Sequence, residues 1–177
     1  MIYLYLHGLH GTPNRERIAW IRQNYTHQAL APQIDYVSEK DTVFERIAQQ
    51  LQNHPEIRFI FGVSMGGYLA FHLGEYFGLP TVTVNPALGY RSTTDLLLPE
   101  EDRRHSRHLI FLGLEDTTIP PETTHRFLES YGRKSIVKVV EVPQLGHRLP
   151  YEALPVLWPQ AETWLTEPFP ERPPLEE

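Results

Sequence analysis

The amino-acid sequence predicts an α/β protein in which a mostly parallel sheet is covered by helices on both faces. Short apolar runs alternate along the chain with segments of helical periodicity. This alternation is typical of parallel sheets, because parallel strands need crossover connections that are usually helical. A Gly-x-Ser-x-Gly segment over residues 62–66 lies between an apolar run and a helical segment. That context indicates a strand, a sharp turn and a helix.

The first part of the chain is expected to form two strands and two helices. Residues 2–6 are an apolar run, and residues 14–26 carry apolar side chains on one helical face. A weak strand is expected within residues 28–37. Thr42 and Glu45 have the spacing of a capping box, and apolar residues recur behind them at helical spacing, so a second helix is expected there.

Four further strands are expected in the rest of the chain, each formed by an apolar or β-branched run. The four expected strands are residues 57–61, 81–84, 108–112 and 136–142.

Helices are expected directly after Gly66, over residues 121–132, and within residues 151–166, where two prolines obscure the boundaries. Residues 168–177 are rich in proline and are expected to form an extended tail beyond a single domain of residues 1–167.

Ser64, the central residue of the Gly-x-Ser-x-Gly segment, is a candidate nucleophile. The flanking glycines permit a tight turn that would hold the serine in strained geometry, with its hydroxyl clear of the sheet. Asp116 follows the strand expected at 108–112, and His147 follows the strand expected at 136–142. The carboxyl ends of parallel strands meet at one edge of a sheet. We therefore expect a hydroxyl, a carboxylate and an imidazole to gather there, which indicates acyl-transfer chemistry.

Each of these residues also has a purely structural interpretation. Ser64 could satisfy backbone groups in a turn, and His147 could be an ordinary loop histidine. Asp116 could be a turn or helix-approach residue. The adjacent Glu115 offers a rival carboxylate, so the sequence leaves two candidates for the acid.

His7 and His10 lie on a glycine-bearing loop after the first strand and raise the question of a metal site. The chain contains no cysteine, and no carboxylate cluster accompanies the two imidazoles along this loop. No metal is therefore predicted. We expect His7 to brace the loop by hydrogen bonding.

The chain resembles the α/β-hydrolase superfamily over nearly its whole length, because serine, acid and histidine follow one another in that order. More narrowly, it is similar to the small bacterial YqiA/YcfP-type esterases. Leu114 and Thr118 depart from the narrower family, which favours aspartate in this loop, whereas Asp116 fits the wider superfamily. The motifs that carry the narrower resemblance are His7–Gly8 with Pro13, the turn Gly62–Tyr68, and Asn85–Ala87.

The resemblance implies a reduced six-stranded sheet in the order 2-1-3-4-5-6. It also implies an oxyanion hole formed by the backbone amides of Leu9 and Met65. A short cap is expected over residues 88–107, and its leucines could contact an acyl chain or merely seat the cap on the domain. The expected substrate contacts are His10, Tyr68, Leu97 and Leu98.

We therefore expect a cofactor-free serine esterase that cleaves small or short-acyl carboxylic esters through an acyl-enzyme. A thioesterase or acyltransferase would use the same three residues, and a non-catalytic binding module could keep the fold. The absence of cysteine excludes a Cys-His mechanism. A net charge of −6 without a basic stripe argues against nucleic acid as a partner. No apolar stretch approaches the ~18 residues of a membrane span, so a cytoplasmic protein is expected.

Overall fold

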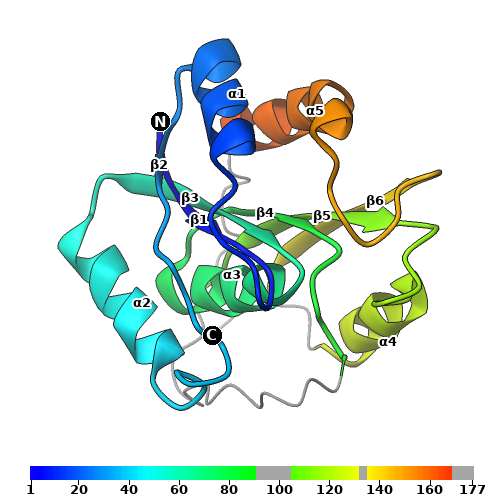
Figure 1. Cartoon of the computed structure of the whole chain (residues 1–177), viewed down its shortest axis with the longest axis horizontal. Coiled ribbons are helices and arrows are strands. Elements are labelled where there is room, and N and C mark those ends of the chain that lie inside the picture. The colour runs from blue at the N-terminus through cyan, green and yellow to red at the C-terminus, as the bar shows by residue number, and fades with distance from the viewer. Residues whose placement is uncertain (91–104, 132–134, 169–177) are drawn as a thin grey trace, which may run out of the picture.

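The fold is built on one central sheet. The computed structural model describes residues 1–90, 105–131 and 135–168 of the chain. Six strands run parallel to one another in the order β2-β1-β3-β4-β5-β6 (Figure 1). The predicted fold class and strand order are confirmed. The strands are β1 (Ile2–Leu6), β2 (Gln28–Leu30), β3 (Ile57–Val63), β4 (Thr81–Val84), β5 (Arg107–Gly113) and β6 (Ile136–Val142).

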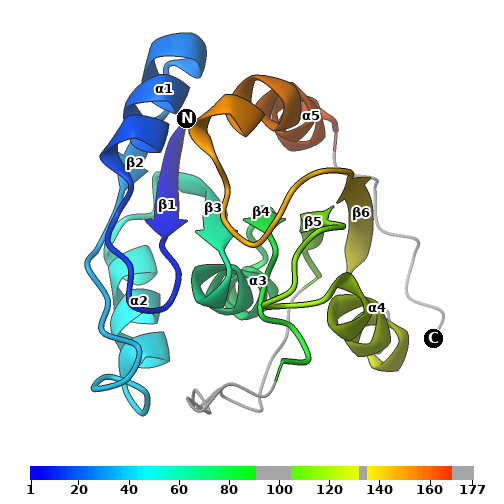
Figure 2. The same cartoon turned by 45° about the vertical axis from the view of Figure 1, so that its right-hand side comes forward.

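Helices cover both faces of this sheet and make the domain three-layered. α1 and α5 pack on one face, and α2, α3 and α4 lie on the other (Figure 2). A single 3-10 turn, η1 (Tyr151–Ala153), leads into α5. The helices are α1 (Arg15–Tyr25), α2 (Val43–Asn53), α3 (Met65–Phe77), α4 (Pro121–Ser130) and α5 (Leu154–Thr166).

Alternate residues of the central strands supply the two sides of the core. The rings of Tyr3 and Phe59 stack with centroids 5.0 Å apart on the face covered by α1 and α5, where Trp158 packs against both. Leu4 and Ile60 belong to the cluster on the opposite face, under α2 and α3. Because both faces are buried, these strands are apolar almost throughout. This is why their sequences form continuous apolar runs.

The weak strand expected within residues 28–37 is present and short: β2 ends at Leu30, two residues before Pro32, which has no N–H for a sheet hydrogen bond. The structure corrects two other predicted details. Thr42 precedes α2, but the predicted capping box is wrong: its ψ of −11° is not that of an extended cap, and its hydroxyl points to the Glu39 carbonyl instead. The helix expected to run to residue 132 ends at Ser130.

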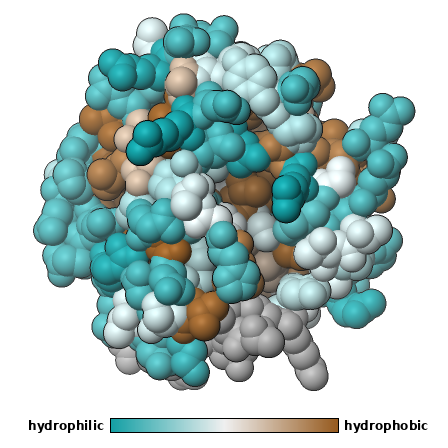
Figure 3. Space-filling model, in the orientation of Figure 1, coloured by the Kyte–Doolittle hydropathy of each residue, from teal (hydrophilic) through white to brown (hydrophobic). Residues whose placement is uncertain are grey.

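Part of the predicted organisation lies outside the described residues. This holds for residues 91–104, which include Leu97, Leu98 and most of the expected cap, and for residues 169–177 of the expected tail. Among the helices that the structure describes, none is long and apolar enough to cross a membrane. The face shown in Figure 3 is mostly hydrophilic, with hydrophobic residues in separate patches.

Candidate active site

Ser64 occupies the single residue between the end of β3 and the start of α3. Its backbone has φ 55° and ψ −119°, a conformation that is costly for any residue with a side chain. Two glycines make the turn possible. A Cβ at Gly62 would overlap the carbonyl of Gly66, and a Cβ at Gly66 would overlap the carbonyls of Leu6 and His7. The turn therefore brings α3 against the ends of β1 and β3.

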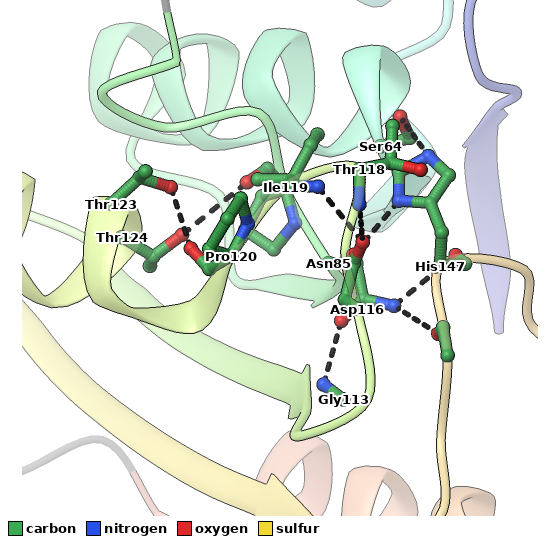
Figure 4. Close-up of polar contacts among 12 residues, drawn as sticks. Ser64, Asn85, Gly113, Asp116, Thr118, Ile119, Pro120, Thr123, Thr124 and His147 are labelled. Atoms are coloured by element: carbon green, nitrogen blue, oxygen red, sulfur yellow. Dashed lines mark hydrogen bonds and ion pairs between the residues drawn. The ribbon is translucent and has the colours of Figure 1, made fainter.

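His147 and Asp116 lie beside this serine, at the carboxyl ends of the strands (Figure 4). The Nε2 atom of His147 is 3.1 Å from the hydroxyl oxygen of Ser64, and its Nδ1 atom is 2.8 Å from a carboxylate oxygen of Asp116. A carboxylate can only accept, so Nδ1 carries the proton and Nε2 is left to accept one. The three side chains thus form one continuous hydrogen-bonded chain.

The carboxylate of Asp116 is fully buried and is held by its own loop. Its second oxygen accepts hydrogen bonds from the backbone amides of Thr118 and Ile119, both at 2.8 Å. Glu115 is exposed, and its amide donates to the carbonyl of Leu145. Of the two neighbouring carboxylates, the one that contacts the imidazole is that of Asp116.

Two backbone amides in the segments that adjoin the serine have no hydrogen-bond acceptor among the described residues. Across residues 1–90, 105–131 and 135–168, the N–H groups of Leu9 and Met65 donate to no other protein group. Met65 is the first residue of α3, where amides are left without helical acceptors. Leu9 follows Gly8, and a Cβ at Gly8 would lie 3.3 Å from the Cβ of Ser64. Both amides are therefore available to an anion that forms at the serine.

His7 holds the loop that carries Leu9, as the sequence predicts. Its ring is buried: Nε2 accepts a hydrogen bond from the Ile34 amide at 3.0 Å, which leaves Nδ1 to donate to the Gly8 carbonyl at 2.8 Å. The hydroxyl of Tyr36 donates to the His7 carbonyl at 2.8 Å. Burial lowers the pKa of His7, and the hydrogen bond to Gly8 opposes only part of that shift. His7 is therefore a neutral brace.

The residues expected to contact substrate are less closely gathered than the three chemical groups. His10 is exposed, with a left-handed φ of 55°. Tyr68 is half-buried on the first turn of α3, and its ring centroid lies 4.5 Å from that of His72. Leu97 and Leu98 fall outside the described residues. Within the part of the chain that the structure describes, no three histidine or acidic side chains are grouped as metal ligands would be.

Asn85 is a buried residue of the site whose importance the sequence did not reveal. It follows β4 with φ 46°, and its side chain links the last residue of β5, Gly113, to the loop after β6 (Figure 4). The sequence signal was the Asn-Pro-Ala turn, which we noted only as part of a resemblance. A polar residue at the carboxyl end of a buried strand, between the strands that precede Ser64 and Asp116, is the clue that could have identified it.

Comparisons with known proteins agree with this architecture. A family model described as "Uncharacterised protein family (UPF0227)" matches residues 2–112, a segment that includes Ser64 and ends before Asp116 and His147. Several solved structures are similar over almost the whole chain at 15–18% identity. Likeness at this level of identity concerns the fold, and the chain has the α/β-hydrolase fold.

Three of these structures show how similar the folds are and how much of each chain is covered. Arabidopsis thaliana SOBER1 has a TM-score of 0.65 and 18% identity, with 93% of this chain and 97% of that chain covered. A monoacylglycerol lipase from Paleococcus ferrophilus has a TM-score of 0.65 and 16% identity, with 93% of each chain covered. XC6422 from Xanthomonas campestris, described as a serine hydrolase without a lid, has a TM-score of 0.62 and 15% identity, covering 95% of this chain and 84% of that chain.

The state of the His7 ring can be tested directly. The pKa of His7 is lowered in the folded protein. When the pH falls below about 6.5, the ordinary pKa of histidine, the unfolded chain therefore binds a proton at His7 more readily than the folded protein does. The stability that neutral His7 contributes is therefore complete above that value and is lost as the pH falls through the lower folded pKa. We expect nitrogen NMR to show Nε2 still largely unprotonated at a pH where a model histidine peptide is half protonated. Titration of His7 in step with a model histidine peptide would contradict this.

Proposed function

Because this chain belongs to the UPF0227 family and has the α/β-hydrolase fold, we propose that it is a serine hydrolase of carboxylic esters that works through an acyl-enzyme. The observation that most strongly supports this proposal is the hydrogen-bonded chain from Ser64 through His147 to Asp116. The serine end of this hydrogen-bonded series is open to solvent, since the side chain of His147 is 26% exposed and Ser64 is not fully buried. A substrate carbonyl can therefore approach.

In the proposed reaction, Ser64 attacks the acyl carbonyl while Nε2 of His147 accepts the hydroxyl proton. A neutral serine hydroxyl is a poor nucleophile and needs such a base. Asp116 stays ionised and stabilises the imidazolium that forms, because its carboxylate faces Nδ1 and is held by two amides. His147 then gives its proton to the departing alcohol.

The amides of Leu9 and Met65 are proposed to bind the oxyanion of the tetrahedral intermediate. Both N–H groups lack a protein acceptor within the described residues, and Met65 adds the positive end of the α3 dipole. One such donor is typically worth about 2.7–4 kcal/mol of barrier. Water then attacks the acyl-enzyme, with His147 as base, and releases the acid. This cycle uses only side chains, amides and water.

The substrates are proposed to be small esters with short acyl groups. Residues 85–106 are all that the chain has between β4 and β5, and this segment is too short for a multi-helix lid. A shallow site would bury little of a long acyl chain. The similar XC6422 is itself described as lacking a lid, which is in keeping with this view.

The nucleophile is tested with a fluorophosphonate probe. We expect Ser64 to be the labelled residue, and Ser64→Ala to lose labelling and about six orders of magnitude in kcat. Ser130→Ala is a matched control, because it removes an exposed hydroxyl that donates to the Phe127 carbonyl within its own helix. Equal labelling of the wild type and Ser64→Ala would contradict the proposal. An unlabelled wild type would favour a non-catalytic binding module.

The acid is tested by a pair of isosteric changes. Asp116→Asn should lower kcat by about 10³–10⁴-fold, because an amide beside Nδ1 favours the wrong imidazole tautomer. Glu115→Gln should leave kcat within about threefold, since that side chain is exposed. Steady-state kinetics on one soluble ester, with circular dichroism to verify folding, measures both. The reverse ranking would move the role to Glu115.

Acyl-chain preference is tested with a series of p-nitrophenyl esters and their thioester counterparts. We expect kcat/KM to be highest for two- to four-carbon acyl groups and to fall with length, without a jump at the micellar threshold. Each methylene that a pocket fails to bury forfeits roughly 0.8 kcal/mol. A steady rise through long chains would indicate a lipase-like site, and a strong preference for thioesters would indicate a thioesterase.

A further inference from the structure

We infer that Asn85 is a positioning residue that fixes His147 against Ser64 by binding the backbone of the loop that carries the histidine. This inference rests on the proposed function, because it assigns Asn85 to the working geometry of that same site. The side chain of Asn85 forms its hydrogen bonds with backbone groups, and none of them is with the Ser64 hydroxyl or the imidazole ring. Its effect on the reaction would pass through the loop of residues 143–150, here called the histidine loop.

The side chain of Asn85 uses its hydrogen-bonding capacity on two different loops. Its amide nitrogen donates to the carbonyls of Gly146 at 2.8 Å and His147 at 3.2 Å. Its amide oxygen accepts from the backbone N–H of Gly113 at 2.7 Å. Figure 4 shows this side chain between Gly113 and the backbone of His147. One buried carboxamide therefore joins the end of β4 to the start of the acid loop and to the histidine loop.

The histidine loop has few other attachments at this point. Among the described residues, no backbone amide donates to the carbonyls of Gly146 or His147. A Cβ at Gly146 would meet only the Glu115 carbonyl, at 3.8 Å. The preceding residue, Leu145, is held by the Glu115 amide and by its close approach to Gly113, so the polar contacts of Asn85 act one and two residues beyond that attachment. Asn85 thus supplies the polar contacts that set the height of the His147 backbone over the sheet.

A small displacement of that backbone would matter. The imidazole must reach Asp116 through Nδ1 and Ser64 through Nε2 at the same time, at 2.8 and 3.1 Å. A shift of about 1 Å in a reacting group can cost about 10²-fold in rate. The carboxylate of Asp116 cannot easily shift with a displaced imidazole ring, because two backbone amides hold it in place.

Asparagine suits this position for a second reason, its backbone. Asn85 has φ 46°, in the left-handed region where asparagine, aspartate and glycine are the best tolerated residues. Its own amide donates to the Phe111 carbonyl at 2.9 Å. Replacement by aspartate or glycine therefore tests the side chain without adding backbone strain, whereas alanine would confound the two effects.

The far end of the histidine loop is held independently. The guanidinium of Arg17, at the start of α1, donates to the Leu149 carbonyl and also to the Tyr5 hydroxyl at 3.2 Å. The loop therefore stays attached to the domain when the contacts of Asn85 are removed. This predicts an effect on the rate that is larger than the effect on the fold.

The experiment compares Asn85→Asp and Asn85→Gly with the wild type. Aspartate keeps the shape and the acceptor for Gly113 but sets a second carboxylate oxygen against two carbonyls, and glycine removes all three bonds. Asn24→Asp is the matched control, since the amide of Asn24 also donates to a carbonyl, that of Trp20, on the exposed face of α1. It makes the same change of charge away from the site.

We expect both Asn85 variants to lower kcat and the rate of fluorophosphonate labelling together, by about 10²-fold, with KM within about threefold. The downfield NMR resonance of the His147 Nδ1 proton should shift or broaden. Asn24→Asp should match the wild type in all three measurements. Thermal melting curves identify a temperature at which every variant is folded, and all measurements are made there. If Asn85→Asp does not fold, the comparison is made with Asn85→Gly alone.

The failure of this inference differs from the failure of the proposed function. If the wild type is labelled at Ser64 and the folded Asn85 variants are labelled at the same rate, Asn85 is not a positioning residue. If the wild type is not labelled at all, the proposed function fails instead. The Nδ1 proton resonance still decides in that case, because an unchanged resonance in the Asn85 variants overturns the inference.

Discussion

The close approach of α3 to the carboxyl ends of β1 and β3 is the constraint on which the rest of the site depends. Gly66 lies so near the carbonyls of Leu6 and His7 that no side chain fits between them. The helix can begin there only because the chain reverses through Ser64 in a left-handed conformation. The same turn places the first amide of α3 directly after the serine, and the loop after β1 lies against it at Gly8.

The loops after β4, β5 and β6 form a second layer of constraint around the first. Glu115 donates through its amide to the Leu145 carbonyl, and Gly113 lies so close to Leu145 that a Cβ would overlap its carbonyl. Asn85 joins both loops to the end of β4. The acid and the histidine are therefore parts of one hydrogen-bonded assembly. Their separation is set by backbone contacts, which act in addition to the bond between Asp116 and His147.

The sequence predicted the features that follow from hydrophobic pattern and from the order of motifs along the chain. Strand order followed from the family resemblance, and the meeting of Ser64, Asp116 and His147 followed from their places after three parallel strands. It favoured Asp116 but left Glu115 as a rival, because adjacent residues differ only in the direction that the loop gives them. Features that depend on three-dimensional contact were missed for the same reason. Asn85 binds carbonyls 61 and 62 residues away, and no local pattern encodes that.

A second hydroxyl–imidazole–carboxylate chain in the same molecule shows why contact geometry alone does not make an active site. The hydroxyl of Thr81 lies 2.7 Å from Nδ1 of His108, whose Nε2 is 2.6 Å from a carboxylate oxygen of Glu75. Thr81 and His108 are completely buried, and the hydroxyls of Tyr131 and Ser135 occupy the same carboxylate.

The two chains differ in everything that chemistry on a substrate requires. His108 is sealed from solvent, and burial lowers its pKa while the neighbouring Glu75 acts in the opposite direction. His147 is partly exposed, its partner serine is held in a strained turn, and two amides without partners among the described residues lie beside that serine. In the hydrogen-bonded series of Thr81, His108 and Glu75, the hydroxyl residue has no strained backbone and no substrate could reach it. This series joins α3, β4 and β5 as a buried polar link. Access, strain and unpaired donors, rather than the identity of three side chains, distinguish the candidate site from its buried counterpart.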